Sequence, residues 1–307
     1  MNKFVRIIKN PYRTFSYLAT RGHFKWMSDK TYLKLMFRSQ MGKKLDLKNP
    51  KTFNEKLQWL KLYDRKPEYT KMVDKYEVKK YVAGIIGEEY IIPTLGVWGS
   101  FDDIDFDMLP DQFVLKCTHD SGGLVICKDK ARFDKAVAKE KIERCLNKNY
   151  FYLHREWPYK DVKPRIIAEQ YMEDAETQEL RDYKFYCFDG EVKMLLVATD
   201  RQKKNSVTKL DFFDMDYNHL PFSWGRPNAE TIPQKPKGID VMVELSKKIS
   251  ANMTHIRVDF YSVNGNVYFG EITFYPDSGF GKFDPEEWNY RMGSWLKVPS
   301  NLKKGEK

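Results

Sequence analysis

The sequence lacks the features that would assign it to several common classes of protein. It has only four cysteines in 307 residues, without a CxxC pair, and its five histidines show no spacing typical of zinc ligands. A disulfide framework and a zinc site are therefore not expected, and reduced cysteines suit the cytoplasm. No apolar run approaches the roughly 20 residues of a membrane-spanning helix, and the first residues lack the hydrophobic region of a signal peptide. We expect a soluble, cytoplasmic protein.

Arginine-rich tracts and known nucleic-acid-binding motifs are also missing, although the chain is strongly basic. The net charge is +10 and the sequence pI is about 9.1, which favours an anionic partner. Nucleotide phosphates, an acidic lipid surface, a uronate-bearing glycan and nucleic acid all fit that description. Because the positive charge is spread along the chain, we do not expect nucleic acid to be the partner. A hydrophobic content of 42% with 15% aromatic residues predicts a well-packed protein.

Residues 1–50 are basic and aromatic and predict two short helices, interrupted near Pro11 and Gly22. Their basic face could rest on the inner surface of an anionic membrane. The alternative is a helical appendage that packs on the main body of the protein.

The segment from Arg257 to Phe274 predicts a hairpin, because Asn264-Gly265 separates two apolar runs. Asp259 lies in the first strand and Glu271 in the second, each among residues that are able to bury their side chains. Buried carboxylates need a cation or several hydrogen-bond donors. Two acids from paired strands form an oxygen site suited to Mg²⁺. The alternative is an amphipathic hairpin with two solvated acids.

Residues 113–128 predict a second hairpin, with the loop Thr118–Gly123 between two apolar strands. Its glycines allow close approach of a ligand to the backbone, and successive free N–H groups can bind an anion. Lys116 precedes this loop and could reach phosphate oxygens, or it could extend to solvent. The segment is not a Walker motif, since no GK[ST] follows the loop.

The remaining pattern alternates helices and strands. Thr52 and Glu55 form a capping box for a helix, and a second helix is expected over 67–82. By pattern alone, Asp74 and Lys75 on that second helix are a surface pair. Asp189-Gly190 predicts a third hairpin over 180–198, in which Lys184 has unusually apolar neighbours. Residues 200–238 form a long excursion, and loops of that length are commonly functional or mobile.

Several short motifs occur in an order that resembles the ATP-grasp superfamily. More closely, the sequence is similar to the branch named after the teichuronopeptide biosynthesis protein (TupA-like) and found with bacterial surface-polysaccharide genes. The resemblance extends from about Thr52 to the C-terminus. It rests on these motifs: Asp74-Lys75, Phe113–Lys116 with Ser121-Gly122-Gly123, Glu169–Met172, Arg181–Lys184, Arg257–Asp259 and Gly270–Thr273.

The resemblance implies an α+β, ATP-grasp fold in which two α+β lobes grip ATP, with an N-terminal helical extension. The expected regions are a basic extension (1–50), a helical region (51–112), a small lobe with the glycine loop (113–168) and a large lobe with the metal site (169–307). The residues that the resemblance places around ATP are Lys75, Lys116, Ser121, Gly122, Gly123, Glu169, Gln170, Tyr171, Met172 and Asp174. The two lysines would hold phosphates, the loop would cover them, and Glu169–Met172 would face the adenine, with Glu173 or Asp174 near the ribose.

The resemblance also implies the metal site and the catalytic residues. Asp259 and Glu271 would bind Mg²⁺, and Thr273 stands where related ligases usually carry asparagine. Arg257 would stabilise charge on the transferring group, and Lys184 would face the γ-phosphate.

Such a site implies an ATP- and Mg²⁺-dependent carboxylate–amine ligase that works through an acyl phosphate. The expected substrates are an amino acid or amine and a uronic-acid carboxyl of an anionic glycan. Three alternatives remain: a sugar kinase on the same fold, a glycosyltransferase, for which no DxD-like metal motif is found, and a basic polyanion-binding module. Lysines, an arginine and two acids favour phosphoryl transfer, which needs positioning and cations rather than a strong nucleophile from the protein.

Overall fold

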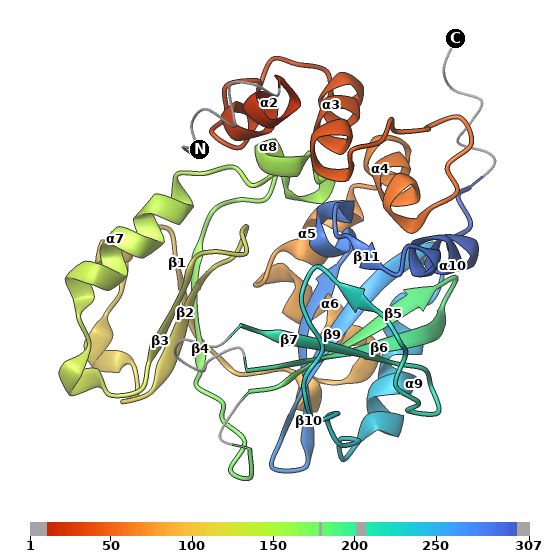
Figure 1. The fold of residues 1–307 in the computed structure, drawn as a ribbon. Helices are drawn as coiled ribbons and strands as arrows, with labels where there is room; N and C mark the ends of the chain where they lie inside the picture. The colour runs from red at the N-terminus through yellow and green to blue at the C-terminus, as the bar shows by residue number, and fades with distance from the viewer. Residues whose placement is uncertain (1–10, 178–179, 201–206, 300–307) are drawn as a thin grey trace.

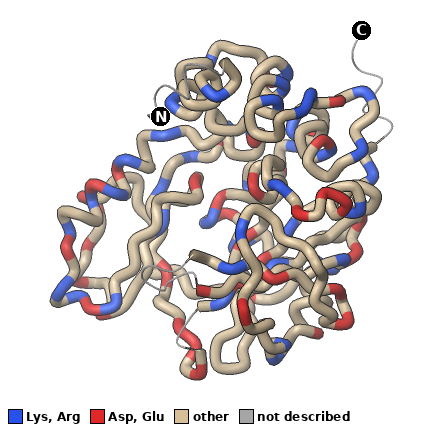
Figure 2. The backbone as a smooth tube through the Cα atoms, in the orientation of Figure 1, with Lys and Arg blue, Asp and Glu red and all other residues tan. Residues whose placement is uncertain are grey.

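The computed structural model describes residues 11–177, 180–200 and 207–299, which form two antiparallel sheets flanked by helices (Figure 1). Lys and Arg residues are distributed over the whole chain, as Figure 2 shows. No helix in the described parts of the chain combines the length and the hydrophobicity needed to span a bilayer.

Two N-terminal helices pack on the main body. α2 (Pro11–Ala19) and α3 (Asp29–Met41) share an apolar cluster that includes Leu62 and Phe280 from elsewhere in the chain. The hydroxyl group of Tyr32 donates a hydrogen bond to the main-chain oxygen of Leu153 at 2.9 Å. Residues 11–45 therefore form a packed appendage. Residues 1–10 of the predicted extension lie outside the described residues, and membrane contact stays a prediction.

Three helices connect this appendage to the sheets: α4 (Phe53–Tyr63), α5 (Glu68–Val73) and α6 (Glu77–Ile86). The predicted capping box is confirmed, since Thr52 and Glu55 exchange hydrogen bonds at the start of α4. The single helix expected over 67–82 is wrong, because the chain becomes extended at Asp74 and its carboxylate accepts the Tyr76 N–H at 2.9 Å. Because the Asp74 side chain bonds to the backbone at this point, α5 ends before Asp74 and α6 begins after it.

The small sheet has the strand order β1-β4-β2-β3. Its strands are β1 (Thr94–Trp98), β2 (Phe113–Cys117), β3 (Leu124–Cys127) and β4 (Ile166–Gln170), and α7 (Lys135–Leu146) contacts β2 and β3. The predicted hairpin over 113–128 is confirmed by the β2–β3 pairing. The small sheet extends beyond the expected small lobe (113–168) at both ends. It includes β1, which lies within the expected helical region, and residues 169–170.

The large sheet has the order β10-β9-β5-β6-β7. Its strands are β5 (Asp182–Phe188), β6 (Glu191–Thr199), β7 (Lys209–Phe213), β9 (His255–Val263) and β10 (Asn266–Thr273). Both predicted two-residue turns are confirmed, because φ is positive at Asp189 (49°), Gly190 (79°), Asn264 (51°) and Gly265 (83°).

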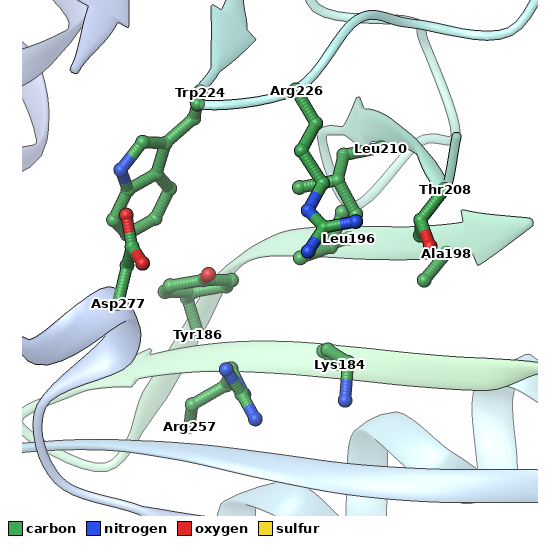
Figure 3. A pocket seen from close by; sticks show the side chains of 11 residues that line it. Lys184, Tyr186, Leu196, Ala198, Thr208, Leu210, Trp224, Arg226, Arg257 and Asp277 are labelled. Carbon is green, nitrogen blue, oxygen red and sulfur yellow. The ribbon is translucent and has the colours of Figure 1, made fainter. Parts of the chain in front are cut away.

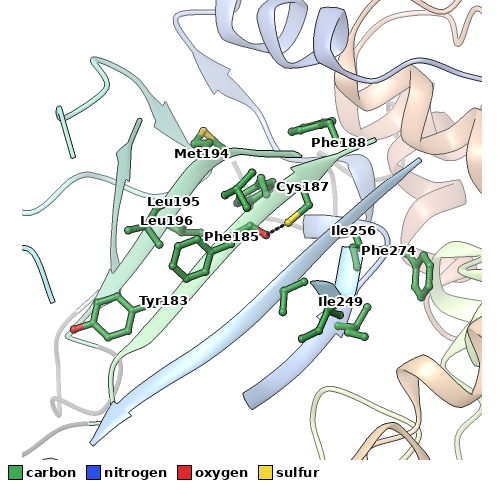
Figure 4. Close-up of a cluster of buried hydrophobic side chains, with 14 of the residues drawn as sticks. Tyr183, Phe185, Cys187, Phe188, Met194, Leu195, Leu196, Ile249, Ile256 and Phe274 are labelled. Carbon is green, nitrogen blue, oxygen red and sulfur yellow. Dashed lines mark hydrogen bonds between the residues drawn. The ribbon is translucent and has the colours of Figure 1, made fainter. Parts of the chain in front are cut away.

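Alternation along β5 separates a core face from a pocket face. Tyr183, Phe185 and Cys187 are buried in the large core, in the cluster that Figure 4 shows, together with residues of α9 (Ile239–Ser250). Lys184 and Tyr186 point to the opposite face, where they line a pocket. Because Tyr183, Phe185 and Cys187 are buried in the core, Lys184 projects from the opposite face of β5.

Smaller elements complete the fold. β8 (Ser223–Trp224) and β11 (Phe283–Asp284) form a two-stranded sheet beside α10 (Glu287–Trp295), and α8 (Phe151–His154) follows α7. The short 3₁₀ turns are η1 (Glu88–Tyr90), η2 (Phe101–Asp103), η3 (Phe106–Met108), η4 (Lys130–Arg132), η5 (Trp157–Tyr159) and η6 (Pro276–Gly279).

Candidate active site

Asp259 and Glu271 face each other across β9 and β10. A register shift between Phe269 and Glu271 makes Glu271, rather than Gly270, the partner of Asp259, and this brings both carboxylates to the same face of the sheet. A side chain at Gly270 would place its Cβ 3.1 Å from the Asp259 main-chain oxygen, so the shift favours glycine. Two solvated acids are excluded, because Asp259 is fully buried, although the side chain of Glu271 is 43% exposed.

Arg257 joins the two carboxylates. Its Nε and one terminal nitrogen donate to the two oxygens of Asp259, both at 2.7 Å, and the same terminal nitrogen lies 2.8 Å from Oε1 of Glu271. Burial would lower the pKa of Arg257, but Asp259 and Glu271 outweigh it and raise that pKa. The carboxylates of Asp259 and Glu271 therefore both lie against the guanidinium group of Arg257.

Lys184 approaches the same carboxylates from the next strand. It is the register partner of Asp259 across β5 and β9, and its ammonium group contacts the Asp259 carboxylate. Burial lowers the pKa of Lys184, while Asp259 opposes that shift. Burial also opposes ionisation of Glu271, but Lys184, Arg257 and Lys75 outweigh it and lower the pKa of Glu271 to about 2. Arg257, Lys184, Asp259 and Glu271 are referred to below as the ionic cluster.

A narrow pocket of about 40 Å³ lies between the two sheets, and we refer to it as the interlobe pocket. Lys116 and Glu169 line it from the small sheet, Lys75 from just before α6, Lys79 from α6 itself, and Glu271 from β10. Glu169 accepts from Lys79 at 2.6 Å and from Lys116 at 2.5 Å. Although burial opposes its ionisation, these two lysines lower the pKa of Glu169 to about 2. Lys116 thus shares a cleft with Glu271.

Lys79 is a site residue that the sequence analysis missed. The spacing of four residues from Lys75 is no signal here, because Lys75 lies between α5 and α6 and only Lys79 lies on α6. The surface pair expected at Asp74 and Lys75 is wrong. Asp74 is 3% exposed and pairs with Arg165 at 2.7 Å.

The loop Thr118–Gly123 lies next to Lys75. The Lys75 ammonium group contacts the main-chain oxygen of Asp120, and the main-chain N–H of Lys75 donates to the main-chain oxygen of Thr118 at 3.1 Å. The anion-binding interpretation required a free N–H at Gly123. That N–H is not free, because the Asp120 carboxylate accepts it at 3.0 Å. Ser121 and Gly122 remain exposed at the loop tip.

The predicted adenine strand is only partly in the interlobe pocket. Glu169 lines that pocket, whereas Gln170 and Tyr171 line a separate pocket with Lys128, and Met172 follows half-buried. Asp174 accepts the Asn264 N–H at 2.8 Å and three donors of its own turn, so it ties this segment to the tip of the β9–β10 hairpin. The ribose contact predicted for Asp174 stays a prediction.

The donor set fits a magnesium ion that keeps several waters. Within the described residues, no group of three or more His, Cys, Asp and Glu side chains could hold a metal ion. Asp259 and Glu271 would supply two ligands, and Mg²⁺ would take its others from water and phosphate oxygens. Thr273 donates to Glu271 at 3.3 Å, so its hydroxyl group orients a proposed ligand.

A second pocket, of about 670 Å³, opens on the other side of the ionic cluster (Figure 3). We refer to it as the large pocket. Lys184, Arg257 and Tyr186 form one wall, while Trp224 comes from β8, Arg226 from the segment just after β8, and Asp277 from η6. Within the 200–238 excursion, Trp224 and Arg226 were not predicted individually.

Two facing antiparallel sheets with lysines, an arginine and paired acids between them define an α+β protein of the ATP-grasp fold. The chain belongs to the TupA-like ATP-grasp family, whose model matches residues 55–297.

Similar solved structures are ATP-grasp ligases with low sequence identity. The D-alanine–D-alanine ligase from Bacillus anthracis complexed with ATP is 16% identical, with a TM-score of 0.43, over 76% of this chain and 66% of that protein. The ligase from Helicobacter pylori is 16% identical, with a TM-score of 0.39, over 77% and 61%. PsnB complexed with minimal precursor, Mg and ADP is 12% identical, with a TM-score of 0.37, over 84% and 65%. The match thus spans slightly less than two thirds of each of these proteins. No curated protein matches this chain significantly.

Proposed function

We propose that this protein is an ATP- and Mg²⁺-dependent carboxylate–amine ligase that attaches an amino acid or amine to a uronic-acid carboxyl group of a surface polysaccharide. The observation that carries the proposal is the position of the ionic cluster between two pockets. Glu271 lines the interlobe pocket, whereas Lys184 and Arg257 line the large pocket. Phosphate oxygens of a nucleotide at the mouth of the first pocket and a carboxylate in the second would meet at this cluster.

The proposed nucleotide site is formed by the lysines of the interlobe pocket. Lys75, Lys79 and Lys116 bind phosphate oxygens, and Glu169 fixes the last two lysines through ion pairs of 2.6 and 2.5 Å. An ammonium group has three donors, so each keeps others for phosphate. Asp259 and Glu271 hold Mg²⁺ against these phosphates. When bound, ATP supplies the phosphoryl group that activates the carboxylate, and Mg²⁺ offsets charge on the phosphate oxygens.

The proposed acceptor site is the large pocket. Lys184, Arg226 and Arg257 give it three cationic side chains, which suits a carboxylate on an anionic glycan. Lys184 and Arg257 orient that carboxylate and stabilise the charge that develops on its oxygens during phosphoryl and acyl transfer. Arg226 has no ion-pair or hydrogen-bond partner among the described residues, so its donors are available to substrate.

The proposal is tested by measuring ADP release with methyl glucuronide or methyl galacturonide as acceptor, in the presence of Mg²⁺ and a panel of amines. We expect ADP and an amide, which mass spectrometry detects. AMP and pyrophosphate as products would refute this mechanism. A phosphorylated glycoside formed without amine would instead identify a sugar kinase, and hydrolysis of a nucleotide-sugar donor would identify a glycosyltransferase. Salt-sensitive polyanion binding without Mg-ATP binding would identify a binding module.

A matched pair of variants separates the site from general effects of charge. Lys184→Met should reduce ADP release by about a hundredfold or more, because it removes a cation from both the carboxylate and the phosphate. Lys193→Met, an exposed lysine on the neighbouring strand β6, should leave the rate unchanged. Equal rates in the two variants would contradict the placement of the reaction at the ionic cluster.

A further inference from the structure

The large pocket contains one carboxylate that the reaction described above does not use. Of the described residues that line it, Asp277 is the single acid. In Figure 3 its carboxylate lies beside the Trp224 ring at the end of the pocket away from Lys184. Burial raises the pKa of Asp277, although Arg226 and Arg257 act in the opposite direction, so this carboxylate shares the pocket with cations.

The backbone that carries Asp277 is in an unfavourable conformation. Asp277 and Ser278 both have left-handed dihedral angles, with φ values of 49° and 51°. Such a conformation costs about 1–2 kcal/mol per residue for a side chain other than glycine. Two such residues in succession persist only where the surroundings fix them.

Buried polar side chains from distant segments fix this backbone. The Ser278 main-chain oxygen accepts from Lys61 at 2.8 Å and from Gln58 at 3.1 Å. Gln58 also donates to the Gly279 main-chain oxygen at 2.9 Å, and the Ser278 hydroxyl donates to Glu156 at 2.6 Å. Lys61, Gln58 and Glu156 are all buried. The structure thus holds a strained turn in place with four hydrogen bonds, and the exposed residue of that turn is Asp277.

Gly281 packs directly against this carboxylate and the indole ring of Trp224. A Cβ at Gly281 would lie 2.5 Å from Oδ2 of Asp277 and 1.5 Å from Nε1 of Trp224, so glycine is required there. Nε1 of Trp224 is buried and has no hydrogen-bond partner among the described residues. An unpaired donor and an exposed carboxylate at one end of a pocket suit a ligand group that carries both N–H donors and a neighbouring acceptor.

We propose that Asp277 binds the ammonium group of the amine substrate at the end of the large pocket away from Lys184, and accepts the proton that this group must lose before its nitrogen attacks the acyl phosphate and phosphate leaves. This assignment rests on the proposed function in one respect, namely that an amine is a substrate. It adds the substrate class that this end of the pocket takes: a primary amine that is positively charged and that carries a hydrogen-bond acceptor, such as an amino-acid amide or ester, which Trp224 can bind.

Binding of a matched pair of probes tests the assignment without turnover. Alaninamide carries an ammonium group, and lactamide has a hydroxyl group in its place. In saturation-transfer NMR with a non-hydrolysable ATP analogue and methyl glucuronide, the wild-type protein should bind alaninamide more tightly than lactamide. Asp277→Asn should reduce that preference by about tenfold to a hundredfold, the usual effect of losing a charged hydrogen bond. Asparagine tolerates left-handed angles, so this variant should keep the fold.

The control is Asp240→Asn, which removes an exposed carboxylate at the start of α9 and should leave the preference for alaninamide unchanged. No preference for alaninamide in the wild-type protein, or an unchanged preference in Asp277→Asn, would overturn the assignment.

An activity measurement separates this assignment from the proposed function. Hydroxylamine is uncharged at neutral pH and traps an acyl phosphate as a hydroxamate. Asp277→Asn should therefore keep wild-type hydroxamate formation from methyl glucuronide and lose at least tenfold in kcat/KM for alaninamide. Equal losses with both nucleophiles would refute a role in ammonium binding. Absence of ADP and hydroxamate in the wild-type protein would contradict the ligase, while the NMR preference would still decide the binding site.

Discussion

Replacement of Lys116 by methionine should destabilise the protein far more than the same replacement at Lys128. Both lysines pair with a glutamate at nearly the same distance, 2.5 Å for Lys116–Glu169 and 2.6 Å for Lys128–Glu173. The side chain of Glu169 is only 7% exposed, whereas those of Lys128 and Glu173 are 56% and 34% exposed. Solvent screens the second pair, so burial is the variable that this comparison isolates.

The magnitude follows from the pKa of Glu169. Its reduction from 4.5 to about 2 corresponds to roughly 3 kcal/mol of stabilisation from Lys116 and Lys79 together, net of burial. Without Lys116, Glu169 keeps one of two cations and the full cost of burial. We expect Lys116→Met to lower the free energy of unfolding by about 2 kcal/mol and Lys128→Met by less than about 0.5 kcal/mol.

Urea unfolding at about pH 7 and about pH 4 measures the size of this loss in the free energy of unfolding and the direction in which it changes with pH. A carboxylate whose folded pKa is lowered stabilises the protein above its unfolded pKa, and this contribution is lost as pH falls through the folded value. The difference between wild type and Lys116→Met should therefore shrink below pH 4.5, towards the folded pKa of about 2. The double variant Lys116→Met/Glu169→Gln should recover part of the loss. Equal destabilisation by Lys116→Met and Lys128→Met would refute the reasoning.

Three further predictions concern other parts of the molecule. Glu271→Gln should reduce ADP release by about a hundredfold or more, with little change in the urea midpoint, because the side chain is 43% exposed. Burial lowers the pKa of His255 to about 3, so the unfolded state binds more protons below pH 6.5 and the free energy of unfolding should fall there by roughly 1.4 kcal/mol per pH unit. His255→Asn should remove this contribution and leave the similar one of His154, whose pKa burial also lowers to about 3. Gly293→Ala should cost about 2 kcal/mol, because its Cβ would lie 2.2 Å from Lys51 O, whereas Gly84→Ala, in open space, should stabilise α6 by about 0.5–1 kcal/mol.

Each of these has an outcome that contradicts it. Wild-type turnover in Glu271→Gln would remove this carboxylate from the proposed metal site. An unchanged pH slope in His255→Asn would mean that another group controls acid stability. Equal thermal midpoints for the two glycine variants would show that the contact of Gly293 with the chain before α4 relaxes without cost.

Local signals in the sequence were sufficient for much of the fold. The pairs Asn264-Gly265 and Asp189-Gly190 correctly predicted their hairpins, because few residue pairs adopt two successive positive φ values without cost. Thr52 and Glu55 gave the start of α4, because a capping box is complete within four residues. The ordered motifs also pointed to the family to which the chain belongs.

Other features depend on residues that are far apart in the chain. Asp74 was expected at the surface, but it is buried by its pairing with Arg165. Lys79 enters the interlobe pocket because Glu169, on β4, accepts it. The position of Asp277 depends on Lys61 and Glu156, which hold the turn that carries it.

What the sequence determined by itself is therefore the set of local elements and the residue types that phosphoryl transfer requires. The tertiary structure decided which of those residues share a site. Without the register shift at Gly270, Asp259 and Glu271 would lie on opposite faces of the sheet, since side chains alternate along a strand. A shift of one residue depends on how β9 and β10 pack against their neighbours, and this long-range packing has no local signature in the sequence.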